Sequence, residues 1–367
     1  MARLLEQFRA GKPAALARAV SIVENHRAGF EQVLASQHAL LGRARRIGIT
    51  GPPGAGKSTL TTRLARWYRD HDLRVGIVAV DPTSPFTGGA LLGDRIRMEE
   101  VALDPGVFIR SMATRGSLGG LATATREVCD VLDGFGMDVI LIETVGVGQS
   151  ELDVSRAADS TLVVLVPESG DSIQTLKAGV MEIADVFTVN KADRPGADRL
   201  RNDIELMLGL RAGATLKDVP AHHGVDLRSA PDRDALRDAM NPARAARAAA
   251  REEAPEQWTP PVLRSVAAQN EGIDEIADAL DRHVRYLERS GELRTRRRAR
   301  LRERVMEIVE QQVRERLWRD AGTMAWLDAQ LDALESGTLV PFAAADTLRQ
   351  RSAALLTGAS FAPHQDA

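Results

Sequence analysis

A glycine-rich loop near residue 50 limits the possible folds of this chain more than any other feature. The short apolar run Ile47–Thr50 leads into the loop Gly51–Thr59, and a segment compatible with a helix, Leu60–Tyr68, follows. The loop has the GxxxxGK(S/T) spacing, in the strand–loop–helix order that a phosphate-binding loop requires. Its glycines let backbone N–H groups turn towards phosphate oxygens, and the helix N-terminus adds positive potential. The sequence therefore predicts that the chain binds a nucleoside triphosphate.

Two side chains of the loop have roles of their own. Lys57 can reach the β- and γ-phosphates, and Ser58 supplies a hydroxyl to Mg²⁺. The residues expected to contact the nucleotide here are Gly51, Pro52, Pro53, Gly54, Ala55, Gly56, Lys57, Ser58 and Thr59.

Runs rich in valine and isoleucine mark the strands around this loop. They are apolar without strict alternation, and stretches long enough for helices separate several of them. We therefore expect an α/β fold with a mostly parallel sheet that helices cover on both faces. The expected strands are Ile47–Thr50, Val75–Val80, Val107–Arg110, Val139–Ile142, Leu162–Val166 and Val186–Val189, with Val262–Val266 as a possible last strand.

Helical patterns flank this region on both sides. Apolar residues recur at three- and four-residue steps between Leu4 and Leu41, so we expect an N-terminal helical extension over residues 1–45, before a nucleotide-binding domain over 46–282. In residues 283–367 an apolar stripe from Leu301 to Leu317 predicts a helix over Arg297–Arg319, about 35 Å long at 1.5 Å per residue. That helix could pack on its own chain, or could pair with a second copy.

The composition limits the kinds of partner. The 367 residues include 48 basic and 51 acidic side chains, so the formal net charge is −3, and no overall field draws the chain to nucleic acid or membrane. A single cysteine, Cys129, excludes an intramolecular disulfide framework and fits a reducing compartment. Met1–Lys12 lacks a secretion signal, and no apolar run reaches about 20 residues. We expect a cytoplasmic protein that binds neither nucleic acid nor membrane.

An NKxD element identifies the base. The run Val186–Val189 leads into Asn190, Lys191 and, two residues later, Asp193. A carboxylate at this place can accept two hydrogen bonds from guanine, whereas adenine offers no such pair of donors. Because a site built on hydrogen bonds rejects an analogue that lacks them by roughly 10⁴-fold or more, we expect GTP rather than ATP. Backbone N–H groups of Ser265, Val266 and Ala267 could complete the base pocket.

Three acidic residues follow or lie between the expected strands, where a metal ion would be held. Phosphoryl transfer depends on positioning and on charge stabilisation, so carboxylates for Mg²⁺ and a sensor of the γ-phosphate are expected. Asp81 and Glu143 end strand-like runs, and Asp94 lies in a glycine-interrupted stretch. The backbone N–H of Gly146 can contact the γ-phosphate. Gln149 can orient the attacking water, although a purely structural amide is an equal interpretation.

Together these motifs resemble those of the MeaB/ArgK family, to which the methylmalonic aciduria type A protein belongs. The resemblance extends from about Leu4 to Ser290. The segments that carry it are Gly51–Thr59, Asp81–Met98, Arg115–Gly120, Glu143–Gln149 and Asn190–Asp193.

The resemblance implies a GTPase of the SRP-related, metallochaperone-like P-loop class. It implies that the protein serves an adenosylcobalamin-dependent acyl-CoA mutase, chiefly methylmalonyl-CoA mutase. GTP would control both the transfer of cobalamin from an adenosyltransferase and the removal of damaged cofactor. The resemblance also implies a homodimer formed through C-terminal helices. It identifies Glu168–Lys177 as a further switch loop, with Lys177 as its charged contact.

The family assignment implies roles for the residues already named. Lys57, Ser58, Asp81, Asp94 and Glu143 would surround the phosphates and Mg²⁺. Asn190 and Asp193 would read the base.

Two other functions stay open at this point. One is a kinase acting on a small transport-related substrate, a role attached to the ArgK name. The other is a GTPase that inserts nickel, since hydrogenase and urease maturation factors look similar around the phosphate loop. Those proteins usually carry Cys/His metal sites, whereas here His222 and His223 are adjacent and Cys129 is remote in sequence.

Overall fold

The computed structural model describes residues 1–82, 98–114, 120–144, 150–167, 179, 181–211 and 257–356. The chain divides into two compact units, Met1–Arg296 and Arg297–Ala367. The first unit contains a sheet and the helices that cover it, and the second unit is helical in its described part.

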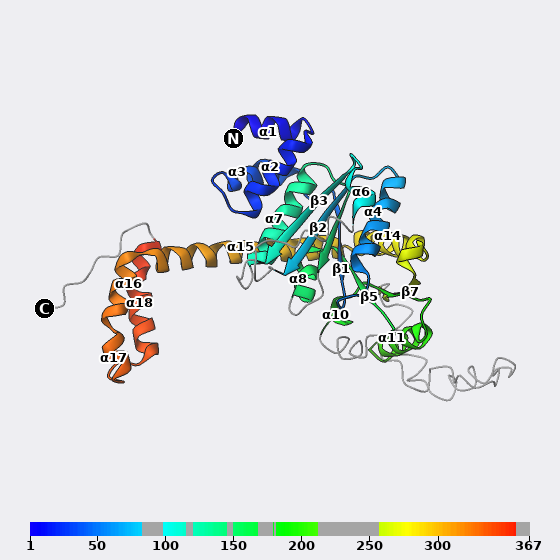
Figure 1. Ribbon diagram of the computed structural model, residues 1–367. Helices are drawn as coiled ribbons and strands as arrows, with labels where there is room; N and C mark the ends of the chain where they lie inside the picture. The colour runs from blue at the N-terminus through cyan, green and yellow to red at the C-terminus, as the bar shows by residue number, and fades with distance from the viewer. Residues whose placement is uncertain are drawn as a thin grey trace. The chain divides into compact units, whose positions relative to one another are not determined.

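Seven parallel strands form the sheet of the first unit, in the order β3-β2-β4-β1-β5-β6-β7 (Figure 1). The α/β prediction and each expected strand are confirmed, with ends that differ by a few residues. The strands are β1 Arg45–Thr50, β2 Val75–Pro82, β3 Val107–Thr114, β4 Val139–Thr144, β5 Ser160–Leu165, β6 Val186–Asn190 and β7 Val262–Ser265.

Helices cover both faces of this sheet (Figure 1). The helices of the first unit are α1 Ala2–Arg9, α2 Pro13–Glu24, α3 Phe30–Gln37, η1 His38–Leu40, α4 Lys57–Asp70, α6 Glu99–Ala102, α7 Gly120–Gly134, α8 Ser150–Ala157, α10 Met181–Ile183, α11 Ala197–Arg211, η5 Ala267–Gln269 and α14 Ile273–Ser290.

Hydrophobic cores lie on both faces, because successive residues of a strand face opposite sides of the sheet. On one face, Val78 belongs to a buried cluster with Leu132 of α7 and Val20 of α2. On the other face, Ile77 belongs to a cluster with Leu64 of α4 and with residues of α14. Burial on both faces explains why the strands read as continuous apolar runs.

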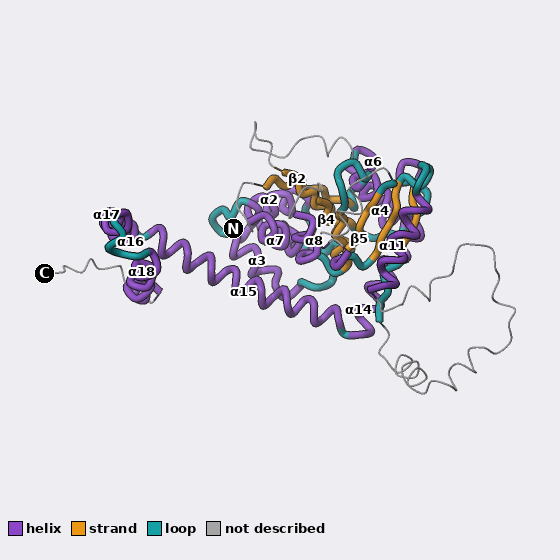
Figure 2. The backbone as a smooth tube through the Cα atoms, turned by 90° about the horizontal axis from the view of Figure 1, so that it is seen from below, coloured by secondary structure: helices purple, strands orange, loops and turns teal. Residues whose placement is uncertain are grey.

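The N-terminal helices pack against α7 within the first unit. In Figure 2, α2 and α3 lie beside α7, and residues of α1, α2 and α3 share one core with it. The sequence division into residues 1–45, 46–282 and 283–367 stays a prediction. One difference is that its second boundary falls inside α14, whose buried residues extend to Leu287.

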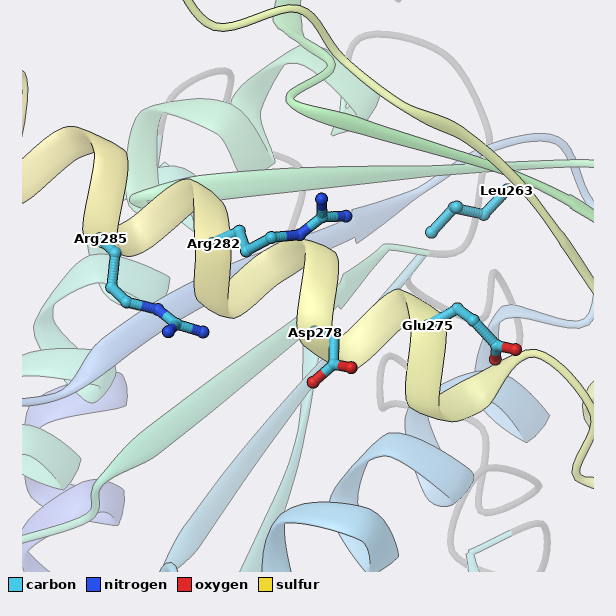
Figure 3. Close-up of a pocket in the computed structure, with 5 residues that line it drawn as sticks. All are labelled: Leu263, Glu275, Asp278, Arg282 and Arg285. Atoms are coloured by element: carbon cyan, nitrogen blue, oxygen red, sulfur yellow. The ribbon is translucent and has the colours of Figure 1, made fainter.

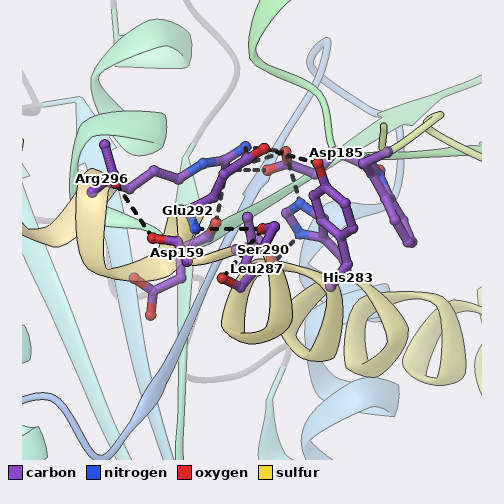
Figure 4. A network of polar contacts seen from close by, with 12 residues as sticks. Asp159, Asp185, His283, Leu287, Ser290, Glu292 and Arg296 are labelled. Atoms are coloured by element: carbon purple, nitrogen blue, oxygen red, sulfur yellow. Dashed lines mark hydrogen bonds and ion pairs between the residues drawn. The ribbon is translucent and has the colours of Figure 1, made fainter. Parts of the chain in front are cut away.

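A partly buried polar network lies where α14 is followed by the next helix, α15 Glu292–Arg319 (Figure 4). Oδ2 of Asp185 accepts a hydrogen bond from the backbone N–H of Thr161 over 2.8 Å, and Oδ1 accepts one from the guanidinium of Arg296 over 3.2 Å. Nε2 of His283 lies 3.2 Å from Oδ1 of Asp185, and its Nδ1 lies 2.8 Å from Oγ of Ser160. These contacts tie β5, β6 and α14 to the first turns of α15.

The second unit begins within α15 and continues with α16 Ala321–Ala329, α17 Leu331–Glu335 and α18 Pro341–Leu356. The helix expected over Arg297–Arg319 is confirmed and begins earlier, at Glu292. No residue of α15 is buried among the described residues. Its large exposed apolar residues are Leu301, Val305, Met306, Ile308, Val309, Val313 and Trp318.

Across the described residues, no helix is both long and apolar enough to cross a membrane.

Candidate nucleotide-binding site

The glycine-rich loop connects β1 to α4 and is shaped by left-handed glycines. Gly51 has a φ of 139° and Gly56 a φ of 88°. A Cβ atom at Gly51 would lie 2.0 Å from the carbonyl oxygen of Val164, and one at Gly56 would lie 2.5 Å from Nδ2 of Asn190. Both backbone conformation and space therefore require glycine at these two positions.

Lys57 is the first residue of α4, and its side chain folds back over the loop. It is buried, and its Nζ donates to the carbonyl oxygens of Gly51 over 2.8 Å and of Pro52 over 2.9 Å. The ammonium group and the N-terminus of α4 thus contribute positive charge at the same place. This is the electrostatic environment that phosphate groups require.

Ser58 and Glu143 bring two side-chain oxygens together beside the loop. The hydroxyl of Ser58 donates to Oε1 of Glu143 over 2.5 Å. Glu143 lies near the end of β4, where it pairs in register with Ile49 of β1, and it is buried. Hydroxyl and carboxylate oxygens are the hard ligands that Mg²⁺ prefers, so this pair fits a magnesium ion. Of Asp81, the structure describes only the backbone, within β2 beside β4.

A pair of threonines joins β1 to β4 next to this acid. The hydroxyl of Thr144 donates to the hydroxyl of Thr50 over 3.1 Å, and both residues are buried. Sequence reasoning missed this contact. The available signal is that Thr50 ends an apolar run immediately before the loop and that Thr144 lies within the predicted segment Glu143–Gln149.

Asn190 joins the NKxD element to the glycine-rich loop. Its Nδ2 donates to the carbonyl oxygen of Ala55 over 2.8 Å. Its Oδ1 accepts hydrogen bonds from the backbone N–H of Ala267 over 3.1 Å and from the hydroxyl of Ser265 over 3.2 Å. One buried amide therefore connects β6, the end of β7 and the loop, although the sequence separates Asn190 from Ala55 by 135 residues.

The rest of the NKxD element turns away from β6 at the same edge. Lys191 has a φ of 55°, in the left-handed region, and the N–H of Ala192 donates to the carbonyl oxygen of Ser265 over 3.0 Å. Asp193 is exposed, and Val266 is buried. The structure thus brings Gly51–Thr59, Glu143, Asn190–Asp193 and Ser265–Ala267 to the carboxyl edge of the sheet. The predicted residues Asp94, Gly146, Gln149 and Lys177 lie outside the described residues.

A second concave region lies elsewhere on the first unit. Leu263 of β7 and four charged residues of α14 line an open hollow of about 440 Å³ (Figure 3). The charged residues are Glu275, Asp278, Arg282 and Arg285. None of them was predicted as a site residue.

Among the described residues, no group of three or more His, Cys, Asp or Glu side chains is arranged to hold a metal ion.

Comparison with known proteins assigns this chain to a family. Residues 16–322 match the family described as methylmalonyl Co-A mutase-associated GTPase MeaB. This chain belongs to the MeaB family. The resemblance found in the sequence is thereby confirmed, and the strand–loop–helix site is that of a P-loop GTPase family.

Individual relatives of this MeaB family member agree with that assignment. A Pyrococcus abyssi protein named as a candidate GTPase is 46% identical over 306 residues, which are 83% of each chain. The mouse mitochondrial methylmalonic aciduria type A homolog is 31% identical and is matched over 92% of this chain and 76% of its own. A crystal structure titled LAO/AO transport system kinase superposes with a TM-score of 0.62 at 26% identity, covering 95% of this chain and 96% of that one.

Proposed function

We propose that this chain hydrolyses GTP to GDP and phosphate, and that it is a G-protein chaperone of an adenosylcobalamin-dependent acyl-CoA mutase. Methylmalonyl-CoA mutase is the first candidate client, because the matching family is described by its association with that enzyme. The observation that carries the GTPase part is the amide of Asn190, which joins the NKxD element to Ala55 of the phosphate-binding loop.

In this proposal the loop and α4 hold the phosphates. Lys57 would exchange its contacts with the carbonyls of Gly51 and Pro52 for contacts with the β- and γ-phosphates. Ser58 and Glu143, with Asp81 and Asp94, would hold Mg²⁺. A bound Mg²⁺ neutralises negative charge that develops on the phosphates during transfer.

Other predicted residues complete the reaction site in this proposal. Asp193, exposed at the edge of the sheet, would accept hydrogen bonds from N1–H and the N2 amino group of guanine. The N–H of Gly146 would contact the γ-phosphate, Gln149 would orient the attacking water, and Lys177 would contact the nucleotide from a switch loop. Because phosphoryl transfer needs mainly positioning and charge stabilisation, these groups are sufficient for hydrolysis without a covalent intermediate.

We further propose that the nucleotide controls the partner. With GTP bound, the loops that contact the γ-phosphate would be ordered, and hydrolysis would release them. The mutase would sense this difference, so that the GTPase gates cofactor loading and protects or reactivates the enzyme, in the cytoplasm. A cobalamin adenosyltransferase is a second candidate partner. The exposed apolar residues of α15 would pair two copies of the chain.

The test is to measure GTP turnover alone and with purified acyl-CoA mutases. We expect one mutase to accelerate turnover and to recover activity faster when the GTPase and GTP are present. The variant Lys57→Ala should lose both effects. A GTPase rate that no mutase changes would contradict the chaperone role and leave the GTPase role standing. Transfer of the γ-phosphate to a small transport substrate would favour a kinase instead.

A further inference from the structure

A line of buried hydroxyl groups leads from the middle of β6 to Asn190. Oγ1 of Thr188 lies 2.9 Å from Oγ of Ser265, and the hydroxyl of Ser265 lies 3.2 Å from Oδ1 of Asn190. Thr188 and Ser265 are both buried, and so is Asn190. Thr188 is outside the NKxD element, and sequence analysis gave it no role.

The orientation of the Asn190 amide is fixed by its backbone partners. The N–H of Ala267 can only donate, so the atom that it contacts must be the amide oxygen. The carbonyl oxygen of Ala55 can only accept, so the atom facing it must be the amide nitrogen. A flipped amide would lose both hydrogen bonds.

This orientation sets the direction of every hydrogen bond in the line. Ser265 has one hydroxyl proton, and it donates that proton to Oδ1 of Asn190. The oxygen of Ser265 must therefore accept from Thr188, and Thr188 must be the donor. The line runs from Thr188 through Ser265 and Asn190 to the carbonyl of Ala55, in the phosphate-binding loop.

The register of the sheet brings Thr188, Ser265 and Asn190 together. Thr188 and Asn190 are two residues apart in β6 and so share a face of the sheet, and Asn190 pairs in register with Ser265 of β7. Among the described residues, the side-chain hydrogen bond of Thr188 is to Ser265 and not to the loop. Any effect on the loop must pass through Ser265.

We infer that Thr188 is a positioning residue of the nucleotide site, which orients Ser265 and, through it, the amide of Asn190 that ties base recognition to the phosphate-binding loop. This inference rests on the proposed guanine-nucleotide binding. Without the Thr188 hydroxyl, the buried oxygen of Ser265 loses its donor, and the Ser265 side chain loses one of the two hydrogen bonds that hold it against Asn190. The amide then holds the loop less firmly.

The test compares GDP affinity in variants of the full-length chain. Thr188→Val keeps the β-branched shape and removes the hydroxyl, so we expect GDP to bind roughly twofold to tenfold more weakly, the range that one hydrogen bond contributes. Thr188→Ser keeps the hydroxyl and should bind like the wild type. Thr125→Val is the matched control, because Thr125 is a buried threonine of α7 whose hydroxyl has no partner among the described residues.

A double-mutant cycle separates positioning from general destabilisation. In a Ser265→Ala background, Thr188→Val should weaken GDP binding no further. Equal losses in both backgrounds, or a lower melting temperature with unchanged GDP affinity, would overturn the inference. If Thr188→Val does not fold, the GDP affinities of Thr188→Ala and Thr188→Ser are compared instead, because these two variants differ only by a hydroxyl group. Equal affinities would then overturn the inference. A wild-type chain that binds no GDP would instead overturn the proposed function, and this inference with it.

Discussion

The hydroxyl of Ser58 donates to Oε1 of Glu143 over 2.5 Å, although 85 residues separate the two in the sequence. The contact brings an oxygen from the start of α4 against an oxygen from the end of β4. In a GTPase these two oxygens are the expected neighbours of one magnesium ion. Their proximity is the most direct link between the sequence motifs and a metal-dependent reaction.

Replacing Glu143 should therefore impair the use of Mg²⁺ more than nucleotide binding. In Glu143→Gln the side chain keeps its size and loses its charge. We expect GTP hydrolysis to fall at least about tenfold and the Mg²⁺ concentration for half-maximal rate to rise, since a charge-assisted contact contributes about 1.5–3 kcal/mol. Steady-state turnover across a Mg²⁺ titration measures both. Glu275→Gln, an exposed change on α14, is the control. An unchanged Mg²⁺ requirement would remove Glu143 from the metal site.

Gly56→Ala should disrupt the junction between the loop and Asn190. The new Cβ would meet Nδ2 of Asn190 at 2.5 Å, in a residue whose φ is 88°. The left-handed backbone alone costs about 1–2 kcal/mol for a residue with a Cβ. Gly11→Ala provides the matched control, because Gly11 has a φ of 70° and nothing within 4 Å of the added Cβ. Chemical denaturation and GDP binding should show a larger loss for Gly56→Ala in both measurements. Equal losses of stability would mean that the clash with Asn190 is relieved without consequence.

Asp193→Asn should change the preferred base. The carboxylate that we propose accepts from the N1–H and N2 amino group of guanine becomes an amide, which can instead donate to the O2 of xanthine. We expect weaker GDP binding and stronger xanthosine diphosphate binding, as competition with a fluorescent guanine nucleotide would show. Because Asp193 is exposed, the folded state should be unaffected. Retention of the guanine preference would refute the assignment of the base pocket.

Alkaline pH should destabilise the first unit through its tyrosines. Tyr68 is buried, and its burial and the nearby carboxylate of Asp281 raise the pKa of its phenol. Burial and the hydrogen bond to Glu292 raise the pKa of Tyr286 in the same direction. A phenol whose pKa is higher in the folded state than in the unfolded state contributes to stability. That contribution is complete below the pKa of the unfolded state, about 10, and is lost progressively as the pH rises above it. The free energy of unfolding should thus decline above about pH 10.

Tyr68→Phe tests the contribution of that phenol. It should make the decline with pH shallower in denaturant titrations, whatever it does to stability near neutrality. The chain has only two tyrosines, so tyrosinate absorbance reports on them without interference from others. Ionisation of both phenols at about pH 10 in the native protein would contradict the prediction.

Val305→Glu should weaken self-association. Val305 is 61% exposed on α15, so a carboxylate there removes no core packing. In a dimer formed through this helix, the same change would bury two like charges, which we expect to shift the protein towards monomer. Light scattering at several concentrations gives the oligomeric state. Arg314→Glu is the control, because 3.6 residues per turn place Arg314 on the opposite side of α15. A chain that is monomeric before any substitution would exclude the proposed pairing.

The sequence was sufficient to predict the strands and the phosphate-binding loop, because both depend on local patterns. Ile77 and Val78 show why the strand order was not predictable. They face opposite cores, and both are apolar, so nothing in the pattern says which strands are neighbours. The order β3-β2-β4-β1-β5-β6-β7 follows from packing between segments far apart in the chain.

The start of β5 shows how distant contacts change a boundary. The expected strand began at Leu162, because Ser160 and Thr161 are polar. In the structure both belong to β5 and are buried, because Ser160 is paired with His283 and the N–H of Thr161 donates to Asp185. The same reason explains why Thr188 was not predicted. Its role depends on Ser265, which is 77 residues away in the sequence.

The position of Lys57 has a consequence for which anions the loop admits. Its ammonium group has two carbonyl partners within the chain, which fix the positive charge over the loop. A single small anion such as orthophosphate can contact only part of this surface, whereas a polyphosphate tail can reach the lysine, the loop amides and the helix end at once. We therefore expect the loop to hold a polyphosphate more tightly than it holds the small inorganic anions of a cell.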